Sequence, residues 1–368
     1  MEIALHPLDP ANRRPKPTDE KNLVFGRVFC DHMFMMDFTR GKGWENPRIV
    51  PYHLLEMDPA AMVLHYGQGI FEGLKAYRWQ NDKICLFRSD QNWERWNRSC
   101  RRMCMPEIDP AIQAQAVEEL LKLDRDWVPH SVGSSLYVRP TMIATEPHLG
   151  VRPADNYLYF IITGPVAAYY AEGFNPVKIY VSEEYVRTVR GGVGEAKTMA
   201  NYASSLYAAE IAKKKGFTQV LWLDAIERRY IEEVGTSNIF FRIGEELITP
   251  PLTGSILPGV TRNSVMQLAG HWGIKVTERQ ITIDEAIETA KSGEMKEMFA
   301  TGTAAVISPV GEFSYRDQMY RIADAGVGEW SQKLYDEILG IQYGEREDIF
   351  GWVRQLNLES PKLQGGAD

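Results

Sequence analysis

Hydrophobic and polar positions follow two periods along this chain, and together they predict a protein that mixes strands and helices. In the first half, apolar runs rich in β-branched and aromatic residues predict strands. They lie at Val24–Phe38, Lys83–Phe87, Leu136–Ala144 and Tyr157–Gly164. Two helices are predicted between the second and third of these strands, from Ser89 to Met105 and from Pro110 to Asp126, where a polar start is followed by an uninterrupted or amphipathic stretch.

The second half repeats this alternation with its own set of elements. Strands are predicted at Val177–Val181, Gln219–Asp224, Ile231–Arg242, Glu246–Thr249 and Lys275–Gln280, and the helices at Asn201–Lys215, Thr261–Trp272 and Ile283–Ser292. The run from Gln219 is apolar at almost every position, which is typical of a strand buried on both faces. A further apolar segment, interrupted by glycine, follows at Met298–Val310.

Between the two halves, glycine and proline interrupt the chain over Ala167–Pro176, which favours a linker there. We therefore expect an α/β (or α+β) protein of two domains. The smaller would cover 1–169, with a loose polar arm at 1–20; the linker would be 170–176 and the larger domain 177–368. The length of 368 residues also favours two domains over one core.

Charge and composition exclude several classes of function. The net charge of −8 argues against nucleic-acid binding, which needs concentrated positive charge. No apolar run reaches the roughly 18–20 residues that span a bilayer, and the N-terminus has no signal pattern, so we expect a cytoplasmic protein without membrane contact. Cys100 and Cys104 would share a helix face, but no histidine lies near them in sequence, so we expect no metal site.

The candidate chemistry begins with Lys197, in the stretch GVGEAKTMANYASS. This lysine could be a solvated charge, a phosphate ligand in a glycine-rich loop or a nucleophile. Three glycine-containing turns follow it, namely EVGTSN, ILPGVTR and ATGTAAV, which begin at Glu233, Ile256 and Ala300. The Pro-Gly turn of the second leads directly into a predicted helix, whose first N–H groups favour an anion. None of the three is a P-loop or a dinucleotide-binding fingerprint.

One cofactor needs this combination of groups. Pyridoxal 5'-phosphate requires a lysine for its aldehyde, a carboxylate for its pyridine nitrogen, and N–H groups, hydroxyls and an arginine for its phosphate. The sequence therefore predicts a phosphate-bearing cofactor that reacts with amines.

Several motifs, in the same order, resemble those of the branched-chain aminotransferases, which belong to the fold-type IV group of pyridoxal-phosphate enzymes. They are FGRVFCDHM, LHYGQGIFEGLKAYR, SLYVRPTMIATEPHLGV, QVLWLD, EEVGTSNIF, TPPLTGSILPGVTR, FATGTAAV and IQYG, and they extend from about Phe25 to Tyr343. The resemblance implies two α/β domains with the cofactor at their interface. It also implies a reversible ping-pong transfer of the amino group between leucine, isoleucine or valine and 2-oxoglutarate, which becomes glutamate.

The same resemblance assigns cofactor contacts residue by residue. Lys197 matches the Schiff-base lysine, Tyr202 the tyrosine at the cofactor's phenolic oxygen and Glu233 the carboxylate at the pyridine nitrogen. The phosphate and its surroundings would be held by Arg95, Thr236, Val260, Thr261 and Thr303.

Substrate contacts are implied in the same way. Tyr137 and Arg139 would receive the side-chain carboxylate of glutamate, because the planar guanidinium of arginine pairs with a carboxylate through two hydrogen bonds. The aromatic walls of the pocket would be Phe29, Tyr66, Phe71 and Tyr169. Backbone N–H groups of Ala304 and Ala305, with the Tyr66 hydroxyl, would bind the α-carboxylate. Val151 matches a residue that reaches the neighbouring subunit's pocket, which implies a homodimer.

Two alternatives stay open. One is a D-amino acid aminotransferase or an aminodeoxychorismate lyase of the same fold, although the LYVRP and DHM segments favour the branched-chain L-enzyme. The other is a non-catalytic protein that keeps the fold. The mammalian branch of the family has a CxxC redox pair where this chain has Ala305 and Ser308, so no thiol switch is expected there. The preference among the three amino acids, a biosynthetic or degradative role, and assembly beyond a dimer also stay open.

Overall fold

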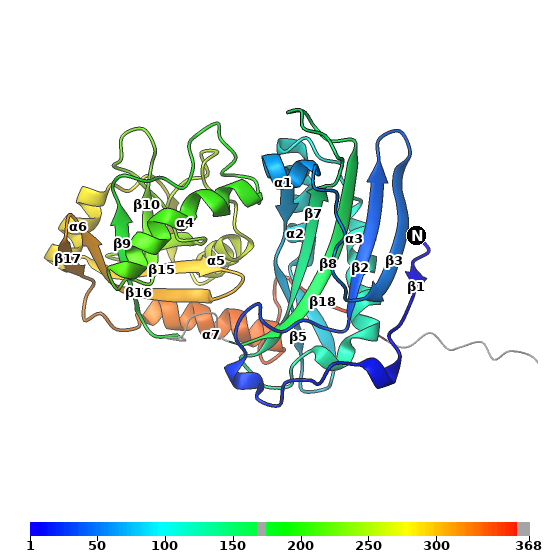
Figure 1. Ribbon diagram of the computed structural model, residues 1–368. Helices are drawn as coiled ribbons and strands as arrows, with labels where there is room; N and C mark the ends of the chain where they lie inside the picture. The colour runs from blue at the N-terminus through cyan, green and yellow to red at the C-terminus, as the bar shows by residue number, and fades with distance from the viewer. Residues whose placement is uncertain (168–173, 359–368) are drawn as a thin grey trace, which may run out of the picture.

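The computed structural model describes residues 1–167 and 174–358. Two sheets with their own helices lie side by side, and α7 (Glu329–Tyr343) runs along one edge from the second sheet to the first (Figure 1). Most of the linker predicted at 170–176, and Tyr169, fall outside the described residues.

The first sheet contains nine strands of the described chain, in the order β1-β3-β2-β8-β7-β5-β6-β18, with β4 attached to β7. β1 and β3 are parallel, and all other neighbours are antiparallel. The strands are β1 (Ala4–Leu5), β2 (His32–Thr39), β3 (Gly43–Pro51), β4 (Gly69–Phe71), β5 (Leu74–Arg78), β6 (Ile84–Phe87), β7 (Ser135–Ala144), β8 (Asn156–Val166) and β18 (Val353–Gln355). The C-terminal part of the chain therefore returns to the first sheet.

The helices of the first half are α1 (Met62–Tyr66), α2 (Ser89–Arg102) and α3 (Pro110–Leu123), with 3-10 turns η1 (Pro10–Asn12), η2 (Glu20–Asn22) and η3 (Arg125–Trp127). Trp93 and Trp96 of α2 and Leu120 of α3 are buried in the same core as Phe34 of β2. Each such side chain stabilises the fold by roughly 1.5–3 kcal/mol. The buried side of α2 also carries Arg95 and Ser99, spaced i, i+4, so both lie on one face of the helix.

The second sheet has nine described strands in the order β11-β10-β9-β16-β15-β12-β13-β14, with β17 attached to β16. β9 pairs in parallel with β10 and β16, and β13 with β14, whereas the other neighbouring strands are antiparallel. The strands are β9 (Val177–Ser182), β10 (Gln219–Leu223), β11 (Ile231–Val234), β12 (Asn238–Ile243), β13 (Glu246–Thr249), β14 (Lys275–Glu278), β15 (Met295–Gly302), β16 (Val306–Tyr315) and β17 (Gln318–Arg321). The remaining helices are α4 (Met199–Lys214), α5 (Val260–His271) and α6 (Ile283–Ser292).

These observations confirm the mixed α/β class, and most predicted elements match within a few residues. Two predicted strands were too long: Val24–Phe38 becomes a strand only from His32, and a turn divides Ile231–Arg242 into β11 and β12. The elements without a counterpart among the predicted strands and helices are β1, β3, α1, β4, β5, α7, β17 and β18.

Helix α7 holds the two sheets in a fixed relationship. It contacts β15 and β16 of the second sheet and β5 and β6 of the first. Its buried Leu334 and Ile338 belong to a core cluster that includes Phe299 from the second sheet and Tyr77 and Phe87 from the first. The space between the sheets is consequently closed on one side by a continuous apolar core.

Candidate active site

A cavity of about 260 Å³ lies where the two sheets meet. The first sheet and α2 contribute Phe71, Gly73, Arg95, Tyr137 and Arg139, and Phe25 precedes β2. The second half contributes Lys197, Tyr202, Glu233, Thr236, Ser237, Asn238, Leu257, Gly259, Val260, Thr261, Thr301, Gly302, Thr303, Ala304 and Ala305. The structure therefore brings together residues that are far apart in sequence and come from both sheets.

Lys197 lies two residues before α4 and points its amine at Tyr202 in that helix: Nζ donates to the Tyr202 hydroxyl at 2.8 Å. Its backbone is held by the first half of the chain. The Lys197 N–H donates to Ser99 Oγ at 2.9 Å, and its carbonyl accepts from the Phe71 N–H at 3.0 Å. The first half of the chain thus fixes the Lys197 backbone through two hydrogen bonds.

Glu233 forms a buried acidic group of the cavity and is only 2% exposed. Its Oε1 accepts from Asn238 Nδ2 at 3.1 Å, and its Oε2 lies 2.7 Å from Arg187 Nη1. Burial raises the pKa of Glu233 to about 7, because desolvation outweighs the opposing effect of the Arg187 guanidinium. A carboxyl with such a pKa can hold or release a proton at neutral pH.

Arg95 reaches the cavity from α2 and is oriented by Glu72. Its Nε and Nη2 donate to the two Glu72 oxygens at 2.7 and 2.8 Å, and its Nη1 donates to the Pro258 carbonyl at 3.1 Å. Asn92 adds a hydrogen bond to Glu72 Oε2 at 2.8 Å. Burial alone would raise the pKa of Glu72, but Arg95 outweighs it and lowers the pKa. The guanidinium is therefore locked in one orientation at the cavity wall.

Next to Arg95, the N-terminus of α5 and two turns expose groups that bind anions. Gly259 precedes the helix, and a Cβ there would lie 2.0 Å from Asn238 Oδ1, so only glycine fits. The N–H groups of the first helical turn, beginning with Val260 and Thr261, have no intrahelical acceptor. The buried Thr301 Oγ1 also has no hydrogen-bond partner among the described residues. Together these groups could hold a phosphate.

These groups fit pyridoxal 5'-phosphate: an amine, a protonatable carboxyl and an anion cup surround one cavity. The opposite wall fits a second carboxylate. Arg139 Nη2 donates to the Tyr137 hydroxyl at 3.0 Å, and both side chains come from β7. The Arg139 guanidinium lies over the Phe71 ring at 4.7 Å, and no carboxylate of the described chain forms an ion pair with it. This cation is available to an acidic ligand.

The predicted residues do not all line this cavity. Phe29 lines an adjoining hollow of about 200 Å³ that shares Tyr137 and Arg139 with it. Tyr66, at the end of α1, is 40% exposed, and Val151, between β7 and β8, is 85% exposed. Neither residue lines the cavity.

Three features of the cavity are absent from the sequence prediction. They are Glu72, Arg187 and the close approach of Gly73 to Tyr137. Glu72 and Gly73 lie inside the GQGIFEGLKA stretch, whose glycines were a usable signal, since a Cβ at Gly73 would lie 1.9 Å from the Tyr137 hydroxyl. Arg187 lies outside every motif, and only its distance to Glu233 identifies it.

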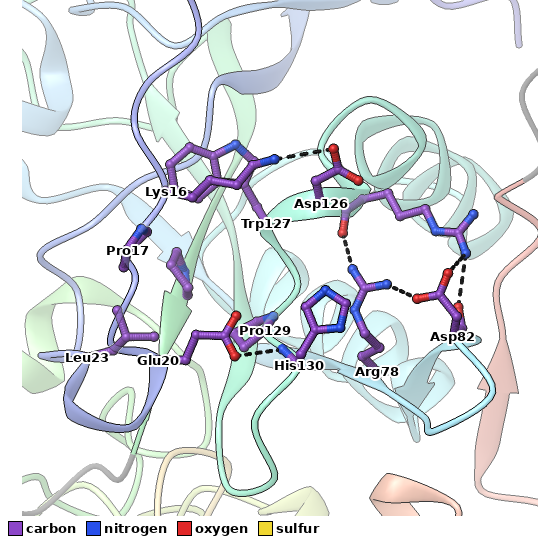
Figure 2. A pocket seen from close by; sticks show the side chains of 12 residues that line it. Lys16, Pro17, Glu20, Leu23, Arg78, Asp82, Asp126, Trp127, Pro129 and His130 are labelled. Atoms are coloured by element: carbon purple, nitrogen blue, oxygen red, sulfur yellow. Dashed lines mark hydrogen bonds and ion pairs between the residues drawn. The ribbon is translucent and has the colours of Figure 1, made fainter.

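A larger hollow, of about 580 Å³, lies elsewhere, beside the N-terminal arm (Figure 2). It shares no lining residue with the cavity at Lys197. Its charged side chains have partners: Lys16 pairs with Asp126 at 3.3 Å, Arg78 and Arg125 with Asp82, and Glu20 accepts the backbone N–H groups of His130 and Ser131. Because these groups already have partners, the smaller cavity is the candidate active site.

Two further features are absent from the described chain. Residues 1–167 and 174–358 contain no helix with the length and apolar character needed to cross a membrane. The same residues contain no group of three or more His, Cys, Asp or Glu side chains that could hold a metal ion.

Comparison with known proteins gives consistent matches. Residues 69–313 match the model of the family described as amino-transferase class IV. The chain is 55% identical over 346 residues to branched-chain-amino-acid aminotransferase 2 of Bacillus subtilis (strain 168), covering 94% of this chain and 95% of that protein. It is 46% identical over 357 residues to the branched-chain-amino-acid aminotransferase of Mycobacterium tuberculosis, covering 96% and 97%.

Solved structures of branched-chain amino acid aminotransferases share the fold of this chain. The crystal structure of the Escherichia coli branched-chain amino acid aminotransferase has a TM-score of 0.74 and 26% identity, covering 89% of this chain and 99% of that one. The T.th. branched-chain amino acid aminotransferase, solved with pyridoxamine 5'-phosphate, has a TM-score of 0.73 and 25% identity, covering 88% and 98%.

Proposed function

The chain belongs to the class IV aminotransferase family, and we propose that it is a branched-chain amino acid aminotransferase dependent on pyridoxal 5'-phosphate. Its substrates are leucine, isoleucine and valine with their 2-oxo acids, and glutamate with 2-oxoglutarate. One observation carries the proposal: Lys197, Glu233 and Arg95 meet around one cavity between the two sheets. The same arrangement supports the following roles for individual residues.

Pyridoxal 5'-phosphate supplies an aldehyde that reacts with amines and a ring that withdraws electrons from the substrate Cα. Lys197 Nζ would hold the cofactor at rest. With a substrate amine in its place, the free Nζ would take the Cα proton of the substrate and deliver it to the C4′ carbon of the cofactor. The Tyr202 hydroxyl, 2.8 Å away, would keep this amine in place.

Glu233 would hold a proton at the pyridine nitrogen, with Asn238 and Arg187 fixing the carboxyl on either side. At the opposite end, Arg95 and the N–H groups of Val260 and Thr261 would bind the phosphate, aided by Thr236 and Thr303. The ring would then be anchored at both ends, which aligns the substrate Cα with Lys197.

The pocket must accept both a branched aliphatic side chain and an acidic one. Phe71 supplies an apolar face for the first, and Arg139 with Tyr137 supplies a cation and a hydroxyl for the second. The α-carboxylate that all substrates share would meet the N–H groups of Ala304 and Ala305.

A homodimer is the proposed assembly. Val151 is 85% exposed and Leu149 in the same loop is 67% exposed, while Leu64 of α1 is 60% exposed. Neighbouring exposed apolar residues are typical of an interaction surface. We expect a dimer mass by light scattering, and we expect Val151→Asp to weaken both dimerisation and leucine binding. The cytoplasmic location likewise stays a prediction.

The test is an amino-donor profile. The purified protein, loaded with pyridoxal 5'-phosphate, is assayed with 2-oxoglutarate against L and D amino acids. The proposal expects turnover with L-leucine, L-isoleucine and L-valine. Turnover with D-alanine but not L-leucine would instead indicate the D-amino acid enzyme, and a protein that binds no cofactor would indicate a non-catalytic member.

A further inference from the structure

Lys75 is a buried amine that none of the roles above uses. It lies on β5, is 8% exposed, and pairs in register with Tyr137 on β7. Its Nζ donates to the Ala304 carbonyl at 2.8 Å, across the junction of the two sheets and 229 positions along the chain. A side chain of the first sheet thus holds a turn of the second.

This amine has no carboxylate partner among the described residues. Burial lowers the pKa of Lys75 to about 8, so the ammonium form still predominates at neutral pH. A buried, unpaired cation is costly to the fold and is usually retained for a function. The role of this amine must therefore be sought at Ala304, whose carbonyl accepts its hydrogen bond.

The turn that Lys75 contacts is held in a strained conformation. It joins β15 to β16 through Thr303, Ala304 and Ala305, all of which line the cavity. The next residue, Val306, has φ of +61°, which is costly for a β-branched residue. The surrounding structure must therefore fix the turn, and the Lys75 hydrogen bond is one such restraint.

One peptide unit connects Lys75 to the substrate side of the turn. The Ala304 carbonyl and the Ala305 N–H belong to the same planar trans peptide, so they point in opposite directions. The ammonium lies on the carbonyl side, and within the described chain neither Ala304 nor Ala305 donates its N–H to a backbone acceptor. A cation at the carbonyl polarises the peptide and strengthens the N–H on its other side as a donor.

We infer that Lys75 is a positioning residue for the α-carboxylate of every substrate: it orients the Ala304–Ala305 peptide and places a positive charge behind its N–H group. It acts through the turn and does not touch the substrate. This inference rests on the proposed function, because it takes the turn as the α-carboxylate site. It separates two carboxylate-binding elements, since Arg139 would serve only the acidic substrate pair.

The test compares Lys75→Met, Lys75→Gln and Lys75→Arg in the loaded enzyme. 4-Methylvaleric acid, a carboxylate without an amine, serves as the probe, and its Kd is measured by calorimetry beside KM for L-leucine and 2-oxoglutarate. In Lys75→Met, which removes the charge, the Kd for 4-methylvaleric acid and both KM values should rise by about tenfold. This size is expected for a cation acting at this range through the protein. Gln, which keeps a donor without charge, should fall between Met and wild type, and Arg should approach wild type. Lys83→Met, at an exposed lysine just before β6, is the matched control and should change none of them.

A second readout separates positioning from loss of structure. The affinity of the apoprotein for pyridoxal 5'-phosphate and the Tm should stay near wild type in Lys75→Gln and Lys75→Arg. Wild-type carboxylate affinity in Lys75→Met would overturn the inference, as would a loss confined to 2-oxoglutarate. If Lys75→Met does not fold, equal carboxylate affinities in the Gln and Arg variants would overturn it. Failure of the proposed function would appear differently, as a wild-type protein that does not transaminate.

Discussion

The Arg187 guanidinium lies 2.7 Å from the Glu233 carboxyl, yet burial still raises the pKa of Glu233 to about 7. An exposed glutamate titrates near 4.5. Between pH 4.5 and about 7, the folded protein therefore keeps the Glu233 proton that the unfolded chain has already lost. Glu233 can consequently carry a proton to the cavity at a pH where most carboxyls are ionised.

This shift predicts a pH dependence of stability. As the pH rises from 5 to 8, the unfolded chain loses the Glu233 proton first, so the folded apoprotein should lose stability relative to Glu233→Gln by about 2 kcal/mol. Urea unfolding of both apoproteins at the two pH values measures this difference. A difference that does not change with pH would show that Glu233 is ionised throughout.

Glu233→Gln should also impair catalysis, because an amide does not keep a proton on the pyridine nitrogen. We expect kcat with L-leucine to fall by about a hundredfold or more. Glu232→Gln is the matched control, since Glu232 bonds to Ser255 and does not line the cavity. Equal losses in the two variants would assign the effect to folding of β11.

Arg95 and Glu72 form a buried ion pair whose members should depend on each other. Arg95→Gln leaves the Glu72 carboxylate buried without its partner and should cost the apoprotein about 3 kcal/mol of unfolding free energy. The double variant Arg95→Gln, Glu72→Gln should lose less than the single Arg95 variant. Strictly additive losses would contradict coupling between the two side chains. Both variants should bind pyridoxal 5'-phosphate weakly, while the affinity for pyridoxal, which lacks the phosphate, changes less.

Arg139 should discriminate between the two half-reactions. Arg139→Gln removes a charged hydrogen-bond donor, so KM for 2-oxoglutarate and glutamate should rise by about 10- to 100-fold, while KM for L-leucine changes far less. Initial rates measured with each substrate varied in turn decide this. Equal increases for L-leucine and 2-oxoglutarate would place Arg139 at the α-carboxylate instead.

The chemistry-bearing residues could be predicted to the extent that they lie in local motifs. Lys197, Glu233 and Thr261 each belong to a turn whose glycines are visible in the sequence, and the structure brings all three to one cavity. Glu72 and Lys75 lie in a glycine-containing stretch, but their roles depend on partners distant in the chain, such as Ala304 for Lys75. Arg187 lies outside every motif, so no spacing rule could identify it.

The elements of the fold were likewise predictable where their signals are local in the sequence. Helices α2, α3 and α6 have clear starts and were predicted within a few residues. α7 was missed although Trp330, Leu334 and Ile338 recur at helical spacing. β18 is a three-residue strand that exists because β6 offers it an edge, a partnership the sequence does not reveal.

The central claim is that Lys197 is the residue that carries the cofactor. The loaded enzyme is reduced with sodium borohydride, which makes the link between lysine and pyridoxal 5'-phosphate permanent, and is then digested and analysed by mass spectrometry. The account predicts that the pyridoxyl label is found on Lys197 and that Lys197→Ala retains no label on any residue of the cavity. A label on Lys75, which is buried at the junction of the sheets, or on a surface lysine in place of Lys197, would contradict it.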